Sequence, residues 1–370
     1  MRKDNKKDNE DVSLPLLTAD GPTTPEAKPF APGQMIRCEE CLRANGPTRV
    51  NCLYCGAALP LNETSVNLQK PALRPLEKWE QGYNNILLPL SANLLQDNPP
   101  PANSVLANLS ETDLAEAADL LKLTQEDLAR ILSLGHPLPL ARAATIDEAK
   151  LVQRRLSRLR IDTVIVPDVD LGVVEARPVR VRAIEIEPGA FTAYQTPETP
   201  GIRVIWSDLM LLVVGRLLVK RIELREQKAR RAENRILDAN EFFTDEPTVE
   251  LYTEGQTTPY RITANTFDFS CLGETKSFVA GENLVAMVEL FRAQAPHVEC
   301  DDSYKSVRKA LDAVWPPQQE NESSGWRRDR PGKYSIGSAT ELTNEMQFLR
   351  YSRLRHYFQS RARERNNENA

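Results

Sequence analysis

Two pairs of cysteines near the start of the chain restrict its fold more than any other feature of the sequence. Cys38 and Cys41 form the first Cys-x-x-Cys pair, ten residues follow, and Cys52 and Cys55 form the second pair. Each pair can turn tightly enough to present two thiolates to one ion, and two such turns complete the tetrahedron that Zn²⁺ prefers. The spacing therefore predicts a Zn²⁺ site whose ligands are Cys38, Cys41, Cys52 and Cys55.

The residues around the cysteines favour the tight turns that such a site needs. Gly56 follows the second pair and tolerates a positive φ, and Asn45-Gly46 supplies turn chemistry between the pairs. With the ending Cys52-Leu-Tyr-Cys55-Gly56-Ala-Ala-Leu59, residues 36–60 resemble the short bacterial zinc ribbon. The resemblance implies a self-contained ribbon with one departure. Leu42 stands where that family usually has glycine, which predicts a less regular first knuckle.

The remaining cysteines indicate a reducing compartment. Only Cys271 and Cys300 lie outside the paired motif, and nothing around them suggests a disulfide framework. Residues 1–11 are charged and lack the apolar core of a signal peptide. Residues 209–219 form the most apolar run, but this run is too short to span a bilayer. The simplest prediction is a soluble cytoplasmic protein without a transmembrane segment.

Composition divides the first part of the chain. Residues 1–34 mix both signs of charge with several prolines and predict a disordered tail, which is followed by the zinc ribbon at residues 35–60. Residues 61–109 are rich in Pro, Asn and Leu, which predicts a linker. Trp79 and the apolar residues 86–88 suggest that the middle of this linker packs on the body.

A pair of helices and a small α/β unit are predicted for residues 110–175. Ser110 and Thr124 can cap successive helices, because a side-chain oxygen there accepts an N–H group that the first helical turn leaves unpaired. A strand, a helix and a second strand are then expected at residues 138–143, 145–159 and 163–166. This order resembles half of a ferredoxin-like domain, which implies a small layered α/β unit.

The helix expected at residues 123–132 also resembles the first helix of repressor-type helix-turn-helix domains. Such a domain needs a recognition helix after the turn at Gly135. Residues 136–139 read His-Pro-Leu-Pro, and the two prolines block a helix there. We therefore expect the two helices to pack against a neighbour, with DNA reading as the alternative.

A bent antiparallel β-sheet module with one closing helix is predicted for residues 176–296, where the apolar pattern changes to period two. The expected strands are residues 179–186, 191–194, 202–206, 209–219, 248–253 and 260–265, before a helix that opens at 281–283. Residues 220–235 are densely charged, which predicts a strand end that runs into an exposed loop or helix. Residues 178–294 resemble the bacterial pleckstrin-homology-like fold, which implies a binding or assembly module.

C-terminal helices separated by a polar linker are predicted for residues 297–370. We expect a short helix at 304–314, the linker at 318–333, and a last helix from Ser338 or Thr340 onward. Six arginines accompany the last helix: Arg350, Arg353, Arg355, Arg361, Arg363 and Arg365. With the aromatic residues between them they would suit a nucleic-acid or membrane surface, whereas docking on the sheet is the simpler expectation.

Catalytic motifs are missing from the sequence. It contains no Walker loop, dinucleotide fingerprint, His-Glu-x-x-His or Gly-x-Ser-x-Gly. The best remaining candidate is Cys300 with His297, which lacks a third, orienting group at a convincing spacing. A site of four thiolates also has no open coordination position for an activated water. We therefore expect a protein that is not an enzyme.

The sequence thus predicts an α+β multidomain fold: an N-terminal zinc ribbon, a small α/β unit, and a bent antiparallel β-sheet module with C-terminal helices. The predicted function is a non-enzymatic zinc-binding adaptor or regulatory protein that docks to another macromolecule, with an unidentified protein as partner. The net charge of −5 argues against a nucleic-acid footprint over the whole molecule. Two alternatives stay open: a nucleic-acid-binding regulator that uses the ribbon and the basic last helix, and an enzyme with a site near Cys300.

Overall fold

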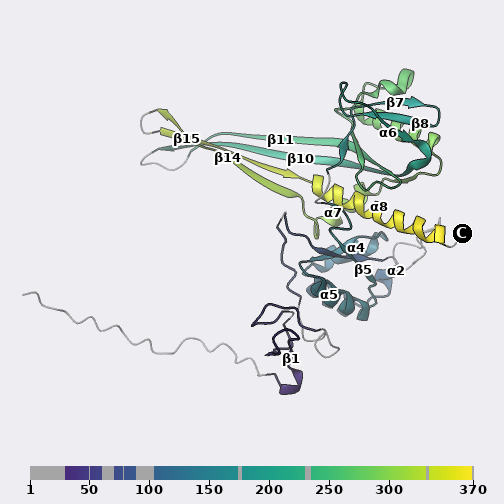
Figure 1. Cartoon of the computed structure of the whole chain (residues 1–370). Coiled ribbons are helices and arrows are strands. Elements are labelled where there is room, and N and C mark those ends of the chain that lie inside the picture. Colours follow the sequence, from purple (N-terminus) through teal and green to yellow (C-terminus); the bar gives the residue numbers. More distant parts are fainter. Residues whose placement is uncertain are drawn as a thin grey trace, which may run out of the picture.

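The described part of the chain is a mixed α and β structure with a cysteine cluster near its N-terminal end, as the sequence predicts. The computed structural model describes residues 30–49, 51–60, 71–77, 79–88, 104–173, 177–229, 235–330 and 333–368. Most of the predicted tail, residues 1–29, lies outside the described residues, as do residues 61–70 and 89–103 of the predicted linker. Figure 1 shows three parts: a ribbon around β1, a body of helices and sheets, and a long arm of strands.

The ribbon (residues 35–60) has very little core. A short 3-10 helix, η1 (Pro32–Gln34), precedes β1 (Ile36–Arg37), which pairs antiparallel with β2 (Ala44–Asn45). Its buried apolar residues are Ile36, Cys38, Cys52 and Leu59. Two of these four are cysteines, so thiol groups take the place of much of the apolar core.

The α/β unit combines three helices with a three-stranded sheet. Helices α2 (Ser104–Ala107), α3 (Glu111–Leu121) and α4 (Gln125–Ser133) are followed by β4 (Pro139–Ala143), α5 (Ile146–Arg158) and β5 (Thr163–Pro167). The side-chain oxygens of Ser110, Thr124 and Thr145 each accept a backbone N–H three residues later, which confirms the caps predicted at Ser110 and Thr124. No helix follows α4 before β4, so a recognition helix is missing at this place in the described chain.

The order of this sheet shows that the linker predicted for residues 61–109 is wrong in part. β3 (Tyr83–Leu87) lies within that range, yet it is the central strand and runs antiparallel to both β4 and β5. Asn84 and Asn85 are fully buried in β3, and their side-chain amides donate to the backbone carbonyls of Val166 and Ala149. These asparagines hide the apolar pattern of a buried strand, because the partners that satisfy them lie far away in the sequence.

The β module has its own core between two sheets and a helix. β7 (Ala183–Glu187), β8 (Ala190–Tyr194) and β9 (Ile202–Ile205) form an antiparallel sheet of consecutive strands, and η2 (Trp206–Asp208) leads from it into the larger sheet. The larger sheet contains β10 (Leu209–Ala229), β11 (Arg235–Thr253), β12 (Tyr260–Thr263) and β6 (Val179–Arg180), which pairs with β12 and is separate from β7. After η3 (Phe269–Thr275), α6 (Ala280–Gln294) packs on this core. The rings of Phe191, Trp206 and Phe291 lie 4.9 to 5.6 Å apart at its centre.

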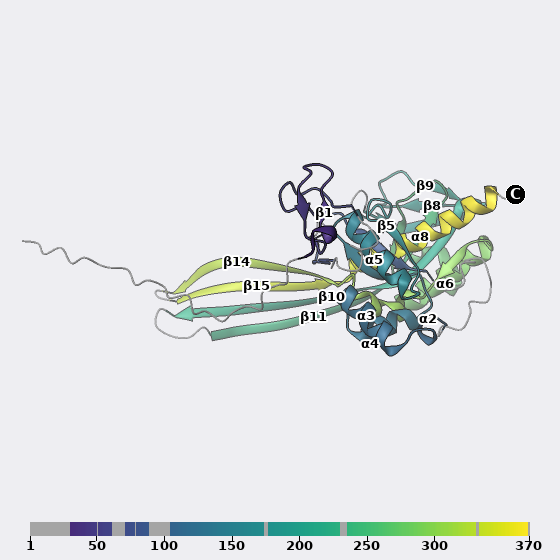
Figure 2. The same cartoon turned by 90° about the horizontal axis from the view of Figure 1, so that it is seen from below.

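The arm is a four-stranded antiparallel sheet in the order β14-β15-β10-β11. β14 (Gln318–Arg330) and β15 (Lys333–Thr343) form a hairpin, and β15 pairs with the outer half of β10. We define the arm as residues 219–229, 235–244, 318–330 and 333–343. Figures 1 and 2 show this sheet extending well beyond the body, with none of the described helices over its outer part.

Three predictions fail at the arm. Residues 220–229 belong to strand β10 instead of a loop or helix, whereas residues 230–234 of that prediction lie outside the described residues. Residues 318–330 of the predicted linker form β14, which pairs with β15. The last helix, α8 (Glu345–Glu368), begins after Ser338 and Thr340, which lie in β15. Both faces of the arm are open to solvent, so its strands carry charges where a core strand carries apolar side chains. The period-two signal is therefore weak.

The C-terminal helices join the β module to the α/β unit. β13 (Glu299–Asp301) pairs parallel with β10, and α7 (Tyr304–Leu311) follows it. One large core runs between the two parts and contains the fully buried Trp315, Phe348 and Tyr351. Gly215 of β10 makes room for it, because a Cβ built there would lie 2.2 Å from a ring atom of Phe348. The body is therefore held together by α7, α8 and the residues beside them.

Candidate metal centre

Each cysteine pair of the ribbon sits in the same kind of hydrogen-bonded turn. In the first, the N–H of Leu42 donates to the carbonyl of Cys38 at 2.9 Å, and the N–H of Cys38 donates to the carbonyl of Arg43 at 3.0 Å. In the second, Gly56 and Ala57 make the equivalent contacts with Cys52, at 3.0 and 2.7 Å. The two turns are repeats of one knuckle, each of which presents its two thiols to a common centre.

Leu42 takes the conformation that the sequence assigned to glycine. Its φ is +60°, close to the +77° of Gly56 at the matching position of the second knuckle. The prediction of a less regular first knuckle is therefore wrong, since both knuckles have the same hydrogen bonds. A left-handed conformation costs a side-chain-bearing residue roughly 1–2 kcal/mol, which the rest of the ribbon must offset.

The four predicted ligand residues come together in space. Their Sγ atoms all lie within 4.8 Å of one another, and the Cys38–Cys55 and Cys41–Cys52 sulfur pairs are each 3.5 Å apart. Tetrahedral bonds of about 2.3 Å from Zn²⁺ to sulfur place the sulfur atoms about 3.8 Å apart, so the cluster is close to that geometry. The arrangement could hold a metal ion, and each knuckle supplies two of the four ligands.

Asn45 supports the cluster from behind. Its side chain is only 2% exposed, its amide donates to the Sγ of Cys52 at 3.4 Å, and its oxygen accepts the N–H of Leu53 at 2.9 Å. The sequence predicts only a turn at Asn45. Nothing in its spacing from the cysteines reveals this second role, because the contact depends on how β2 folds back over the second knuckle.

Hydrogen bonds favour the thiolate form of Cys52. Burial works against ionisation, but the N–H groups of Tyr54 and Cys55 and the amide of Asn45 outweigh it and lower the pKa of Cys52 to about 6. The N–H of Tyr54 lies 3.4 Å from the sulfur. Metals bind the thiolate, so these donors prepare Cys52 as a ligand and partly neutralise its charge once it is bound.

Apolar side chains surround the knuckles on the outside. Leu42, Leu53 and Tyr54 are 67%, 62% and 54% exposed, and each lies in or directly beside one of the two turns. The guanidinium of Arg43 lies 4.7 Å from the centre of the Tyr54 ring, which holds that ring against the ribbon. The tip of the ribbon therefore presents leucine and tyrosine side chains that nothing in the described chain covers.

The other catalytic candidates do not form a comparable group. Cys300 lies in β13, where burial raises the pKa of its thiol, and His297 contacts the carbonyl of Ser207 at 3.2 Å. The described contacts include no hydrogen bond between His297 and Cys300. Asp301, next in sequence, is committed to Arg355 at 2.6 Å.

The arginines of α8 are mostly used inside the molecule. Arg353 is 2% exposed and donates to the backbone carbonyls of Leu171 and Gly172, and Arg355 pairs with Glu299 and Asp301. Arg361, further along, lies 4.3 Å from the centre of the Tyr357 ring. A helix that docks on the body explains these contacts, which was the simpler of the two expectations.

Comparison of the chain with protein-family models, with curated proteins and with solved structures yields no match. The described helices also include none that is long and apolar enough to cross a membrane. The interpretation of the cysteine cluster consequently depends on its own geometry and chemistry.

Proposed function

We propose that this protein is a non-enzymatic zinc-binding docking protein, an adaptor or regulator that binds another macromolecule. Cys38, Cys41, Cys52 and Cys55 would hold one Zn²⁺ in the ribbon. Four thiolates are the usual donor set of closed structural zinc sites, and the donors around Cys52 suit a metal-bound thiolate. The six cysteines form no disulfide, so we place the protein in a reducing compartment such as the cytoplasm.

One observation carries the docking proposal: exposed large apolar side chains gather on the two parts that project from the body. Of seventeen such side chains among the described residues, ten lie on the ribbon or the arm: Met35, Leu42, Leu53, Tyr54, Ile236, Leu237, Phe242, Phe243, Tyr334 and Leu342. Gathered apolar surface of this kind marks sites of interaction with other macromolecules. Both projecting parts are therefore candidate docking surfaces.

The two faces of the arm differ in chemistry. Ile222 and Leu224 of β10 share one face with Phe243 and Leu342, which flank Lys220 on the neighbouring strands. The opposite face carries Arg221, whose guanidinium pairs with Glu223, Glu322 and Glu341 at 2.8 to 3.4 Å. This second face carries three carboxylates around one guanidinium, so it is strongly charged and the apolar face is the better surface for an apolar partner.

The absence of an enzyme activity is also part of the proposal. A closed four-thiolate site leaves a metal no free position for water or substrate. The raised pKa of Cys300 keeps its thiol protonated and therefore a poor nucleophile. A Cys300→Ser variant should match the wild-type protein in every assay of its function, and a loss of function in that variant would favour the enzymatic alternative.

The docking proposal can be tested by quantitative affinity purification of partners with the full chain and with three variants of it. The ribbon variant is Leu53→Ser with Tyr54→Ser, the arm variant is Phe243→Ser with Leu342→Ser, and the control is Val285→Ser, which is 64% exposed on α6. We expect a partner that the wild type and the control retain and that at least one of the surface variants loses. Zinc content and thermal unfolding of each variant show that it remains folded. Identical partner lists for all four proteins would contradict the proposal.

The nucleic-acid alternative predicts a different behaviour. Binding through arginines and phosphates weakens steeply as salt is raised, because it releases condensed counterions. We expect no binding of the intact protein to duplex DNA or to single-stranded RNA at about 50 mM salt, where such binding is strong. Salt-sensitive binding in a fluorescence-anisotropy titration would replace the docking proposal with a nucleic-acid regulator.

A further inference from the structure

A cavity lies at the junction of the α/β unit and the C-terminal segments. Its volume is about 620 Å³, within the range of small-molecule sites in proteins. Apolar walls come from four different segments: Leu73 and Leu76, Leu121 at the end of α3, Leu140 in β4, and Val314 and Pro316 after α7. Four basic side chains also line it, Arg74, Lys122, Arg142 and Arg350, together with one acidic side chain, Glu77.

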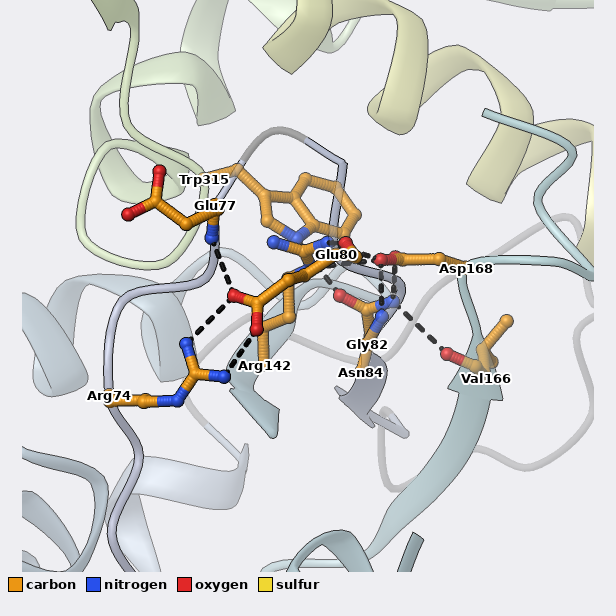
Figure 3. A network of polar contacts seen from close by, with 9 residues as sticks. All are labelled: Arg74, Glu77, Glu80, Gly82, Asn84, Arg142, Val166, Asp168 and Trp315. Carbon is orange, nitrogen blue, oxygen red and sulfur yellow. Dashed lines mark hydrogen bonds and ion pairs between the residues drawn. The ribbon is translucent and has the colours of Figure 1, made fainter. Parts of the chain in front are cut away.

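Two of these cations are neutralised by carboxylates in a polar network, which is buried around Arg142 and exposed around Arg74 (Figure 3). Asp168, 2% exposed, accepts from Arg142 Nε at 2.9 Å, from the N–H of Gly82 at 2.8 Å and from the amide of Asn84 at 2.8 Å. Arg74 forms a two-pronged ion pair with Glu80. Both carboxylate oxygens of Asp168 therefore accept hydrogen bonds within this network, and its charge is paired with Arg142.

Arg350 has no such counterpart. The described residues give it no ion pair or hydrogen bond, and its Nε atom is buried without an acceptor. Burial, together with the positive charge of the neighbouring Arg142, lowers the pKa of Arg350 to about 10, and the negative charge of Asp168 offsets this lowering only in part. The guanidinium has lost hydration that no hydrogen-bonding group of the described residues replaces, and a bound anion would restore that balance.

We propose that this cavity binds a small organic anion, with its carboxylate or phosphate group on Arg350 and its apolar body against the leucine and proline walls. A guanidinium recognises both kinds of anion through paired N–H donors. Lys122 contributes charge at the same wall, although its ammonium also donates to the carbonyl of Ala72. The apolar walls exclude a purely inorganic ion as the natural occupant, because such an ion would leave most of the cavity unfilled.

Calorimetric titration of the full-length protein tests this site with four probes. Hexanoate and phenyl phosphate carry both charge and an apolar body, inorganic phosphate carries charge alone, and benzyl alcohol carries the apolar body alone. We expect hexanoate or phenyl phosphate to bind at least about tenfold more tightly than the other two probes, since a charge-assisted contact and buried apolar area act together. Tighter binding of hexanoate would indicate a carboxylate ligand, and tighter binding of phenyl phosphate would indicate a phosphate ester.

Variants of Arg350 decide whether the binding occurs in this cavity. Arg350→Met should weaken the binding of the better probe by at least about tenfold, and Arg350→Lys should weaken it less. The control is Arg292→Met, which removes an arginine that pairs with Glu289 on α6 and should leave the binding unchanged. The proposal would be overturned if neither hexanoate nor phenyl phosphate binds at millimolar concentration, or if they bind Arg350→Met as tightly as the wild type.

The stability of the same variants provides a second readout. Without ligand, Arg350→Met should raise the Tm by about 2–4 °C, because methionine replaces a half-buried charge that has no hydrogen-bond partner among the described residues. A fall in Tm would show that Arg350 supports the fold itself and would overturn the proposal. Arg292→Met is the control here as well, with a Tm close to that of the wild type.

Discussion

The ribbon and the arm both project from the body without a substantial apolar core of their own, yet they are held in different ways. The ribbon buries only four apolar residues and gathers four thiols within 4.8 Å of one another. The arm is held by continuous strand pairing, from Val219 opposite Thr343 outward to Ala229 opposite Lys333, and by ion pairs across its strands. A projecting element can thus replace a core either with one metal centre or with a long ladder of hydrogen bonds.

The difference has a consequence for cooperativity. A metal centre concentrates the stability of the ribbon in a few side chains, so the loss of one ligand removes all of it. The arm distributes its stability over many backbone hydrogen bonds, each of which contributes about 1 kcal/mol. Single substitutions should therefore have very large effects in the ribbon and small ones in the outer arm.

Removal of the metal should produce the largest effect. A strong zinc chelator should unfold the ribbon, because apparent binding free energies of structural zinc reach about 10–16 kcal/mol and the ribbon otherwise has only a two-residue strand pair and a very small core. In hydrogen exchange measured by mass spectrometry, the amides of Leu42 and Gly56 should lose their protection, whereas those of the arm should keep theirs. Cys52→Ser, which lacks one ligand, should show the unprotected ribbon before chelator is added. Loss of protection in the arm as well would contradict the separation of the two parts.

The ribbon could be predicted from the sequence because its ligands, turns and spacing all lie within one short stretch. The arm and β3 could not be predicted in the same way. β3 contains Asn84 and Asn85, whose partners are Val166 and Ala149, and its neighbours β4 and β5 lie far along the chain. The arm carries Arg221 and Glu223 where a core strand has apolar side chains, and the pairing of β10 with β15 joins residues more than a hundred positions apart.

The next largest effect is expected at the root of the arm. Gly215→Ala would place a Cβ 2.2 Å from a ring atom of Phe348, so this buried ring must move, and the free energy of unfolding should fall by about 1–3 kcal/mol. Gly281→Ala is the matched control, because its Cβ meets only Pro247 at 3.7 Å. Urea unfolding followed by tryptophan fluorescence measures both. The zinc content of Gly215→Ala should equal that of the wild type, and a loss of zinc would show that the ribbon depends on the body.

Asn45→Ala should weaken the metal centre without abolishing it. The substitution removes the donor to Cys52 and leaves the N–H of Leu53 without its acceptor. Outer hydrogen bonds of this kind change metal affinity by about 10–100-fold, so competition with a chromophoric chelator should show a weaker site of that order. Asn51→Ala, at an exposed residue of the same ribbon, is the control. Equal affinity in Asn45→Ala and the wild type would show that the contact with Cys52 has no effect on the metal.

Leu42→Gly should strengthen the ribbon by a smaller amount. Glycine adopts the φ of +60° without the steric cost of a side chain, and part of that gain is lost because glycine is more flexible when unfolded. The net effect should be about 0.5–1 kcal/mol in favour of the folded ribbon, visible as a higher temperature for the loss of zinc. Leu53→Gly, beside the second knuckle, should show no such gain. A lower temperature for Leu42→Gly would mean that the leucine side chain itself supports the fold.

The smallest effect is expected for an ion pair on the arm. Lys220 and Glu241 lie 2.8 Å apart but are 41% and 60% exposed, so water screens their attraction. Glu241→Gln should change the free energy of unfolding by less than about 0.5 kcal/mol. Urea unfolding at low and high salt provides the measurement. A change above 1 kcal/mol would show that the arm, like the ribbon, depends on single side chains.

The most direct test of the account is the metal content of the purified protein. Native mass spectrometry of the full chain should show one Zn²⁺ per molecule, and the mass should fall by one metal ion in Cys52→Ser, with Cys300→Ser as the cysteine control that retains the ion. This result would establish that the four ribbon cysteines form the metal centre. A wild-type protein that carries no zinc when purified under reducing conditions with zinc present, or a Cys52→Ser variant that retains it, would contradict the account.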